Sequence, residues 1–228
     1  SVKIPTDADV MVFQRVTSRL IIDGIKIMRA NGIAVVVDVD DDMHRIHPSN
    51  PAWGALRPGG DKPEYDWNNA QAAFAQATLV TTSTDALTKR YAPHGRVAVL
   101  RNCIPKAALE IPHTDEVSFG WPSALITHAD DPQVVGTAAA RLQREGYEFR
   151  ITGPPRGTKE AFQLDREPTT TGPVPMEHWF RTIANLGVGI APLNDTQFNA
   201  AKSWLKMLEL AAVGVPVVGS PRTEYRRL

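Results

Sequence analysis

The sequence contains a single cysteine, Cys103, in 228 residues. One thiol cannot form an intrachain disulfide, which excludes a disulfide-stapled secreted scaffold and favours a cytoplasmic location. No apolar run approaches the roughly eighteen residues of a membrane-spanning helix, and no signal-peptide pattern follows Ser1. Because Ser rather than Met is the first residue, we expect residues of the natural protein to precede it.

Net charge is also lacking, since 25 basic side chains balance 25 acidic ones. The whole molecule is therefore not drawn to nucleic acid or to an anionic membrane, and only a local basic patch would attract either. We expect no nucleic-acid partner and no transmembrane segment, and we leave peripheral membrane contact open.

What is present is an alternation of strand and amphipathic-helix patterns, which is typical of a layered α/β fold. With 43% hydrophobic residues, the chain suffices for one large domain or two small ones. In the first half, the patterns predict strands at 10–13, 33–37, 79–82 and 97–100 and helices at 18–30, 66–76 and 84–91. The Pro-, Gly- and Trp-containing stretch at 48–63 is interpreted as an irregular loop.

A second α/β series follows a stretch at 102–116 that holds two prolines and little periodicity. The series predicts strands at 124–127, 149–152, 188–191 and 215–218 and helices at 132–145, 176–186 and 201–213. The aperiodic stretch indicates an interdomain linker. We therefore expect a partial N-terminal lobe at 1–105, a linker at 106–117 and a C-terminal lobe at 118–228.

An acidic segment, Asp38–His47, holds four carboxylates and two imidazoles directly behind a predicted buried strand. Three interpretations stay open. The carboxylates, with the two histidines, would hold Mg²⁺ or Mn²⁺ against a phosphate. Alternatively, Asp38-x-Asp40 imitates the nucleophile motif of Mg-dependent haloacid-dehalogenase phosphatases, although the next two residues depart from that motif. In the third interpretation the acids cap the following turn and face a crevice.

The predicted helix at 201–213 carries Lys202, Lys206 and Glu209 on one stripe, separated by four and three positions. Lys202 and Ser203 would then fall in its first turn, where free N–H groups and the helix dipole attract an anion. Glu209, two turns deeper, would accept both hydroxyls of a ribose. The arrangement suits a nucleotide-diphosphate site, but an ordinary solvated helix face explains the same pattern.

Two stretches, Asn199–Glu209 and Ala211–Ser220, resemble the donor-site segment of GT-B glycosyltransferases of the group 1 family, in a variant Lys-Ser-x-Leu-Lys-x-x-Glu form. The strand before it, at 187–193, resembles the same family. Further resemblance lies at 9–15, 35–42, 97–105, 120–124 and 128–131. The resemblance implies an α/β fold of two Rossmann-like lobes, the first incomplete and the second lacking its closing helix, with the chain truncated at both ends.

The resemblance also implies roles for individual residues in a donor site. Glu209 would bind the ribose, while Lys202 and Ser203 hold the diphosphate with help from Lys206. Many group 1 members contact the sugar through a Glu at the position of Ala201, so this contact would pass to Asn199 or Phe198. The familiar Arg and Lys after the first strands of the second lobe are not evident, which places more of the diphosphate binding on Lys202.

Two further pairs of residues are candidates for substrate binding. His128 and Asp130 would contact the donor, or else form a capping turn before the next helix. In the acceptor lobe of such a fold, Asp40 and Asp41 would orient or deprotonate an acceptor hydroxyl without a metal.

The expected function is therefore transfer of a hexosyl or related sugar from a nucleotide-diphosphate sugar to an acceptor hydroxyl. The family implies a retaining, metal-independent reaction with no cofactor, and an acceptor that is a glycan, a lipid-linked molecule or a protein. The alternatives are a non-catalytic nucleotide-sugar-binding module or subunit, and the phosphatase that would use Asp38 and Asp40.

Overall fold

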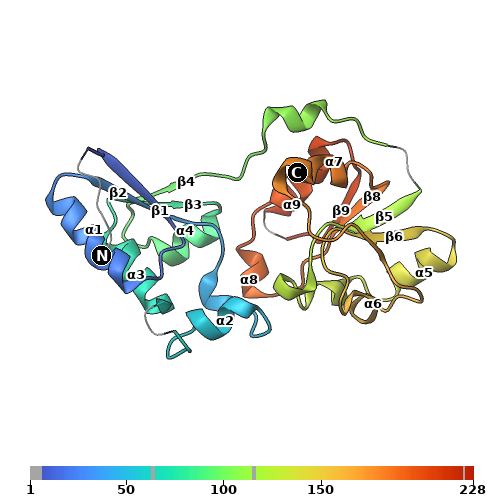
Figure 1. Cartoon of the computed structure of the whole chain (residues 1–228), viewed down its shortest axis with the longest axis horizontal. Coiled ribbons are helices and arrows are strands. Elements are labelled where there is room, and N and C mark those ends of the chain that lie inside the picture. Colours follow the sequence, from blue (N-terminus) through green and yellow to red (C-terminus); the bar gives the residue numbers. More distant parts are fainter. Residues whose placement is uncertain (1–6, 63–64, 115–116, 223) are drawn as a thin grey trace. The chain divides into compact units, whose positions relative to one another are not determined.

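The computed structural model describes residues 7–62, 65–114, 117–222 and 224–228 (Figure 1). The chain forms two compact units. The first is built from the chain up to Arg101 together with Ala200–Ser203, and the second from Asn102–Asn199 and Trp204–Leu228. Within the described ranges, no helix has both the length and the apolarity needed to cross a bilayer.

The first unit is a parallel sheet of four strands in the sequential order β1-β2-β3-β4. The strands are β1 (Val10–Gln14), β2 (Ala34–Val39), β3 (Leu79–Thr82) and β4 (Val97–Val99). The helices are α1 (Arg19–Ala30), α2 (Pro51–Leu56), α3 (Trp67–Gln76) and α4 (Asp85–Tyr91), with a short 3₁₀ turn, η1 (Met43–Arg45).

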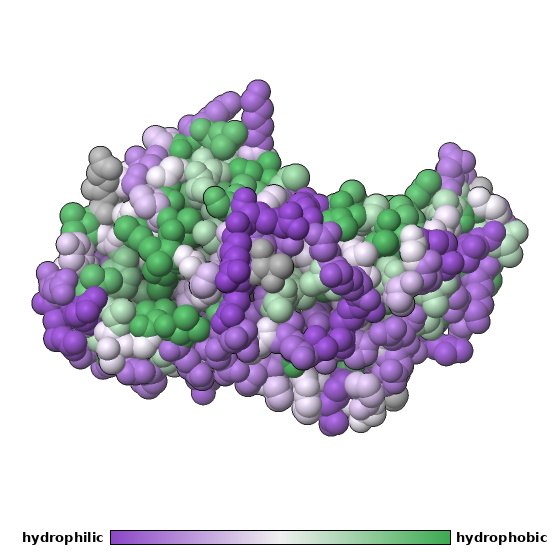
Figure 2. Space-filling model, turned by 180° about the vertical axis from the view of Figure 1, so that it is seen from behind, coloured by the Kyte–Doolittle hydropathy of each residue, from purple (hydrophilic) through white to green (hydrophobic). Residues whose placement is uncertain are grey.

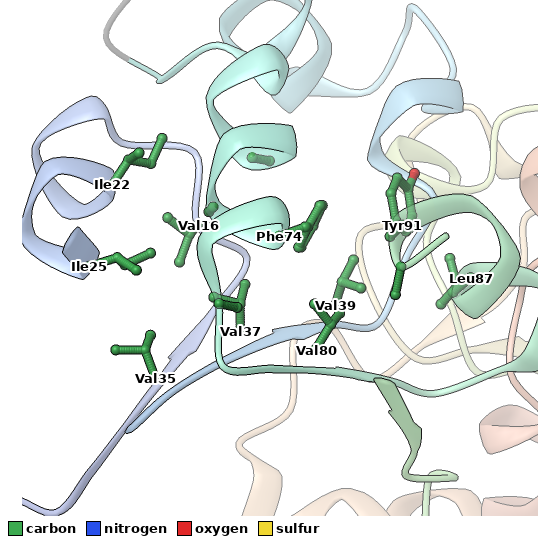
Figure 3. Close-up of a cluster of buried hydrophobic side chains, with 14 of the residues drawn as sticks. Val16, Ile22, Ile25, Val35, Val37, Val39, Phe74, Val80, Leu87 and Tyr91 are labelled. Atoms are coloured by element: carbon green, nitrogen blue, oxygen red, sulfur yellow. The ribbon is translucent and has the colours of Figure 1, made fainter. Parts of the chain in front are cut away.

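Alternation along β2 places its valines in the core of this unit. Val35, Val37 and Val39 are at most 1% exposed, because side chains at every second position of a strand share one face. They pack against apolar side chains of α1 and α3, among them Ile25 and Phe74 (Figure 3). Asp38 of β2 lies on the face opposite these valines. The acidic segment therefore begins on the face of the sheet that points away from this core.

The second unit is a five-stranded parallel sheet in the order β7-β6-β5-β8-β9. Its strands are β5 (Ser118–Trp121), β6 (Glu148–Ile151), β7 (Thr169–Thr170), β8 (Val188–Ala191) and β9 (Val217–Gly219). Its helices are α5 (Ala138–Arg144), α6 (Thr158–Ala161), α7 (Met176–Ile183), α8 (Gln197–Ala200) and α9 (Leu205–Ala212). Short 3₁₀ turns are η3 (Lys106–Glu110), η4 (Leu125–Thr127), η5 (Asp131–Val134) and η6 (Tyr225–Arg227).

This strand order is that of a doubly wound sheet, in which the direction of winding reverses between β5 and β8. Chain connections leave these two neighbouring strands toward opposite sides, which opens a crevice at their carboxyl ends. In such sheets ligands bind in that crevice. The carboxyl ends of β5 and β8 are therefore where the site of this unit is expected.

One face of β5, β8 and β9 also carries an open apolar groove of about 890 Å³. Val134, Leu142, Val188, Ile190 and Val218 are among the residues that line it. Apolar residues reach the surface in several places, seen as green areas in Figure 2, and Val218 is 66% exposed. Because parallel sheets are normally covered on both faces, the groove is a part of this sheet that the described helices leave open.

Most predicted elements of the first half match the structure, and the predicted strand at 188–191 coincides with β8. The prediction of a strand at 124–127 is wrong, since these residues form η4 and the strand is β5, just before them. Pro122 has no N–H with which to continue the ladder. The stretch at 48–63, interpreted as an irregular loop, contains α2, whose cap Asn50 accepts a hydrogen bond from the Ala52 amide at 2.9 Å.

Gly120 of β5 has no side chain, which lets Leu186 and the backbone of β6 pack closely against this strand. A Cβ at position 120 would lie 2.5 Å from Cδ2 of Leu186 and 2.7 Å from the carbonyl oxygen of Arg150. We expect Gly120→Ala to lower the free energy of unfolding by about 1–3 kcal/mol, as overpacking does. Urea unfolding checks this.

The matched control for this substitution is Gly24→Ala in α1, where the added methyl would meet only Cε of Met28, at 3.8 Å. Alanine is the better helix former there, so this variant gains about 0.5–1 kcal/mol. Equal stability of the two variants would contradict the packing described for β5.

Candidate functional site

The crevice of the second unit is built around a buried carboxylate, Asp131, in the first residue of η5. Its side chain is 3% exposed and accepts three hydrogen bonds. One comes from the Asn194 backbone amide at 2.8 Å, one from Nδ2 of Asn199 at 2.6 Å and one from Nδ1 of His128 at 2.7 Å. The donors stand on three segments, two of which follow β8, so this carboxylate joins the loops after β5 and β8.

The charge state of Asp131 follows from these contacts. Burial by itself raises the pKa of the carboxyl group, but the hydrogen bonds from His128, Asn194 and Asn199 and the charge of His128 outweigh it and hold the pKa below its ordinary value. Asp131 is therefore ionised at neutral pH and acts only as an acceptor.

His128 is half-buried between Asp131 and the aromatic side chain of Trp121 at the end of β5, with ring centroids 6.1 Å apart in an edge-on arrangement. Because the carboxylate accepts, the ring nitrogen Nδ1 carries the hydrogen, a tautomer assigned from the hydrogen bond. Nε2 is then the ring atom left for a ligand.

On α9, Lys206 and Glu209 form the second part of the site. The Lys206 ammonium donates to the Pro122 carbonyl, lies 5.0 Å from the ring centroid of Trp179 and is 4.0 Å from Oε2 of Glu209. Glu209 is 7% exposed. Burial raises the pKa of its carboxyl group, and the charge of Lys206 and the nearby Trp179 offset only part of that.

The Trp179 indole presents a buried donor at this place. Among the residues that the structure describes, its Nε1–H has no hydrogen-bond partner of normal length and angle, although it lies near enough to Glu209 to favour the ionised carboxylate. A buried donor without an acceptor is costly in a folded protein. A polar ligand group bound beside Glu209 would therefore give the Trp179 donor an acceptor.

Lys202 and Ser203 precede α9 instead of lying in its first turn, so that prediction is wrong. The helix begins at Leu205, after Trp204. Ala201 is 5% exposed in the core of the first unit, and its carbonyl accepts a hydrogen bond from the Thr84 hydroxyl at 3.0 Å. The apolar pattern that extended the helix backwards to 201 therefore reflects packing against α4 and its cap.

In the first unit, the Lys202 ammonium forms an ion pair with Asp41 at 3.0 Å. Asp40 accepts two hydrogen bonds from the Arg15 guanidinium, at 2.7 and 2.6 Å. Asp38 accepts from the Thr81 hydroxyl at 2.6 Å. The acidic segment is thus matched with donors of its own unit, and in the described part of the chain no three His, Cys, Asp or Glu side chains are placed to hold a metal ion.

The structure brings together only part of the predicted site set. His128 pairs with Asp131, which the prediction passed over in favour of its neighbour Asp130. Asn199 is buried, and its amide nitrogen is engaged by Asp131 and by the Asn194 carbonyl at 3.1 Å. Phe198 is half-buried. The signal for Asp131 was present in the sequence as a His-x-x-Asp spacing, which places both side chains on one side of a turn.

Comparisons with known proteins give structural relatives only. No protein-family profile and no curated protein matches the sequence. Similar solved structures include the catalytic domain of starch synthase IV from Arabidopsis thaliana bound to ADP and acarbose, at 10% identity and a TM-score of 0.54, covering 96% of this chain and 58% of that one. Another is an α-glucosyltransferase in complex with UDP and a 13-mer DNA containing an HMU base, at 13% identity and a TM-score of 0.56, covering 92% and 60%.

A third similar structure, TarM, has 10% identity and a TM-score of 0.50, with 83% of this chain and 41% of that chain covered. The chain thus spans less than two thirds of each of these three structures. Each of the two α/β units has a parallel sheet, and the second sheet is doubly wound. Together with these structural neighbours, this shows that the chain has the fold of GT-B glycosyltransferases.

Proposed function

We propose that this chain takes part in transfer of a sugar from a nucleotide-diphosphate sugar to an acceptor hydroxyl, and that its second unit binds the donor. The observation that carries the proposal is the buried Glu209 at the crevice of a doubly wound sheet, beside Lys206 and the indole N–H of Trp179. A carboxylate in such a place suits the two hydroxyls of a ribose. Two of the similar structures hold ADP or UDP, which agrees with a nucleotide ligand of this kind.

The other proposed roles on the donor side belong to residues that precede Glu209 in the chain. Lys202 and Ser203, directly ahead of α9, hold the diphosphate, and Lys206 assists. Negative charge grows on the diphosphate as the glycosidic bond breaks, so donors fixed in advance stabilise the transition state. Such donors would let transfer proceed without a metal. Retention of the anomeric configuration is part of the proposal because the family resemblance implies it. Phe198 and Asn199 are the proposed sugar contacts, the latter through its position beside Asp131.

On the acceptor side, Asp40 and Asp41 are the proposed groups that orient or deprotonate a hydroxyl. Asp41, 26% exposed, makes its close contact with a lysine, while Asp40 is tied to Arg15. Asp41 is therefore the better placed of the two to exchange its partner for an acceptor hydroxyl.

The test is a calorimetric screen of nucleoside diphosphates and nucleotide sugars, with and without EDTA, followed by assays of donor hydrolysis and sugar transfer. We expect binding that survives EDTA, and turnover of the donor that binds. Binding without hydrolysis or transfer to any acceptor would make the chain a binding module instead of an enzyme. No binding of any nucleotide to the folded chain would remove the proposal.

We expect Glu209→Ala to weaken binding of the best nucleoside diphosphate by about 2 kcal/mol, roughly 30-fold, because it removes hydrogen bonds to a charged acceptor. Glu209→Gln keeps the shape and one acceptor oxygen and should lose less. Since the pKa of Glu209 is raised, wild-type affinity should increase as pH rises through that pKa, whereas the Ala variant shows no such increase.

A second ligand separates a ribose contact from a general weakening of the site. A nucleotide without its ribose 2′ and 3′ hydroxyls should bind the wild type and Glu209→Ala equally, because each change removes the same contact. If the two losses simply add, Glu209 does not bind the ribose.

A further inference from the structure

More contacts fix the position of His128 than a turn-capping histidine at the surface requires. Its partner Asp131 is fixed by the Asn194 amide and by Nδ2 of Asn199 in addition to the imidazole. Trp121 closes one side of the ring. The result is an imidazole whose orientation is set at Nδ1 by a buried carboxylate, while 18% of its side chain stays exposed.

A carboxylate that accepts from Nδ1 has two chemical consequences. It fixes the tautomer, so that Nε2 is the ring nitrogen left for a ligand, and it stabilises the imidazolium form when Nε2 gains a proton. The Nε2–H of an imidazolium is a charged donor, which suits an oxygen of a phosphate group. Imidazoles titrate in the neutral range, so a bound anion can draw this proton from solution.

The other charged and titratable groups at this edge favour such an uptake. Lys206 on α9 is one cation here, and it is directed to the Pro122 carbonyl and to Glu209. Tyr225 of η6 stays a neutral phenol, because burial and the charges of Asp131 and Glu209 raise its pKa. Arg222, after β9, donates to the Leu193 carbonyl and pairs with Asp195 at 2.9 Å. Asp130 lies in the same turn as His128, so a proton on His128 would add positive charge for a diphosphate beside these carboxylates.

We propose that His128 is a diphosphate ligand through Nε2–H, and that binding of a nucleoside diphosphate loads a proton onto it from solvent. The proposal rests on the proposed function for the kind of ligand and goes beyond it in assigning the ligand atom and the proton. Asp131 is the positioning residue of the pair. One proton is taken up from solvent when the nucleotide binds, and one proton is released when it dissociates.

The test is calorimetry of UDP and ADP at neutral pH in PIPES and in Tris, whose ionisation heats differ. The dependence of the binding heat on the buffer gives the number of protons taken up. The nucleotide contributes the same amount to every variant, so the difference between wild type and variant belongs to the protein. We expect the wild type to take up a larger fraction of a proton than either His128→Gln or His128→Asn.

The two variants separate the ring nitrogens. The Gln amide reaches the position of Nε2 and keeps a donor there, while the Asn amide reaches only the position of Nδ1 and keeps the bond to Asp131. We expect His128→Asn to bind UDP or ADP about tenfold more weakly than the wild type at neutral pH, as loss of a charged hydrogen bond implies. His128→Gln should lose less affinity, and Asp131→Asn should lower proton uptake while the ring remains.

The outcomes are distinguishable. Wild-type binding with the same proton uptake in both His128 variants, or full affinity in His128→Asn, would overturn this proposal alone and leave a purely structural histidine. No binding of UDP or ADP by the folded wild type would overturn it together with the proposed function. Thermal unfolding of each variant shows that a loss of affinity is not a loss of fold.

Discussion

Asp42→Ala is expected to lower the free energy of unfolding of the first unit by about 3 kcal/mol, the low end of what breaking a buried ion pair costs. The Asp42 side chain is 1% exposed. It accepts a short hydrogen bond from the Tyr91 hydroxyl and pairs with the Arg90 guanidinium at 2.9 Å. Arg45 completes the surroundings at 3.7 Å.

The loss has two parts. Without the carboxylate, the Tyr91 hydroxyl would be a buried donor in need of a partner, since burial and the contact with Asp42 raise its pKa and keep it protonated. The two arginines would lose their counter-charge, but Arg90 is 28% exposed and can be rehydrated in part. That rehydration is why we expect the low end of the range.

Hydrogen exchange followed by mass spectrometry measures this effect unit by unit. Peptides from β2, α3 and α4 should exchange faster in Asp42→Ala, while peptides from β5, β6 and α7 keep the wild-type rate. Asp41→Ala is the matched control, since that side chain is 26% exposed and its loss should shift stability by less than about 1 kcal/mol. Equal effects of the two substitutions would contradict a buried role for Asp42.

The acidic segment illustrates what sequence patterns could and could not predict. Four aspartates behind a valine strand were correctly placed at the carboxyl end of β2, because the alternation of Val35, Val37 and Val39 is unambiguous. Their individual partners depend on residues distant in the sequence, such as Arg15, Tyr91 and Lys202. A pattern within ten residues therefore predicts where the carboxylates lie relative to the strand, but it does not predict which of them is buried.

The second unit shows the same division for secondary structure. β8 was predicted to the residue, since Val188–Ala191 is flanked by clear helix signals. The pattern prediction missed β5 because Ser-Phe-Gly-Trp has a glycine and no β-branched residue, while Ile126 and Thr127 in the run that follows are β-branched. The strand exists because all four of its residues are buried between β6 and β8, which is a tertiary effect.

The candidate site was predictable where it follows local spacing. Lys206 and Glu209 share a helical turn of α9, as three-residue spacing requires. Lys202 is not on that helix, because Ala201 is buried in the first unit. No spacing rule reveals such a break, since an alanine that packs elsewhere looks the same as one on a helix face.

Lys202→Ala is expected to lower the rate of sugar transfer by about 100-fold, near 3 kcal/mol of transition-state stabilisation, if Lys202 neutralises the departing diphosphate. In the structure its side chain is 19% exposed, and its ammonium is held by Asp41 at 3.0 Å. A partly exposed pair of this kind contributes about 1 kcal/mol or less, so the variant should unfold near the wild-type temperature. The rate, measured with saturating donor, is the quantity that changes.

Two control variants separate the charge of Lys202 from its pairing. Lys202→Arg keeps a cation and should retain more activity than the Ala variant, though the geometry of its donors differs. Asp41→Asn keeps the lysine and weakens the carboxylate that competes with phosphate for it, so the nucleoside diphosphate should bind more tightly, most clearly at low salt. Asp41→Asn should also slow transfer if that carboxylate deprotonates the acceptor. Transfer by Lys202→Ala at the wild-type rate would show that the ion pair with Asp41 is structural, and that the leaving diphosphate is stabilised by other groups.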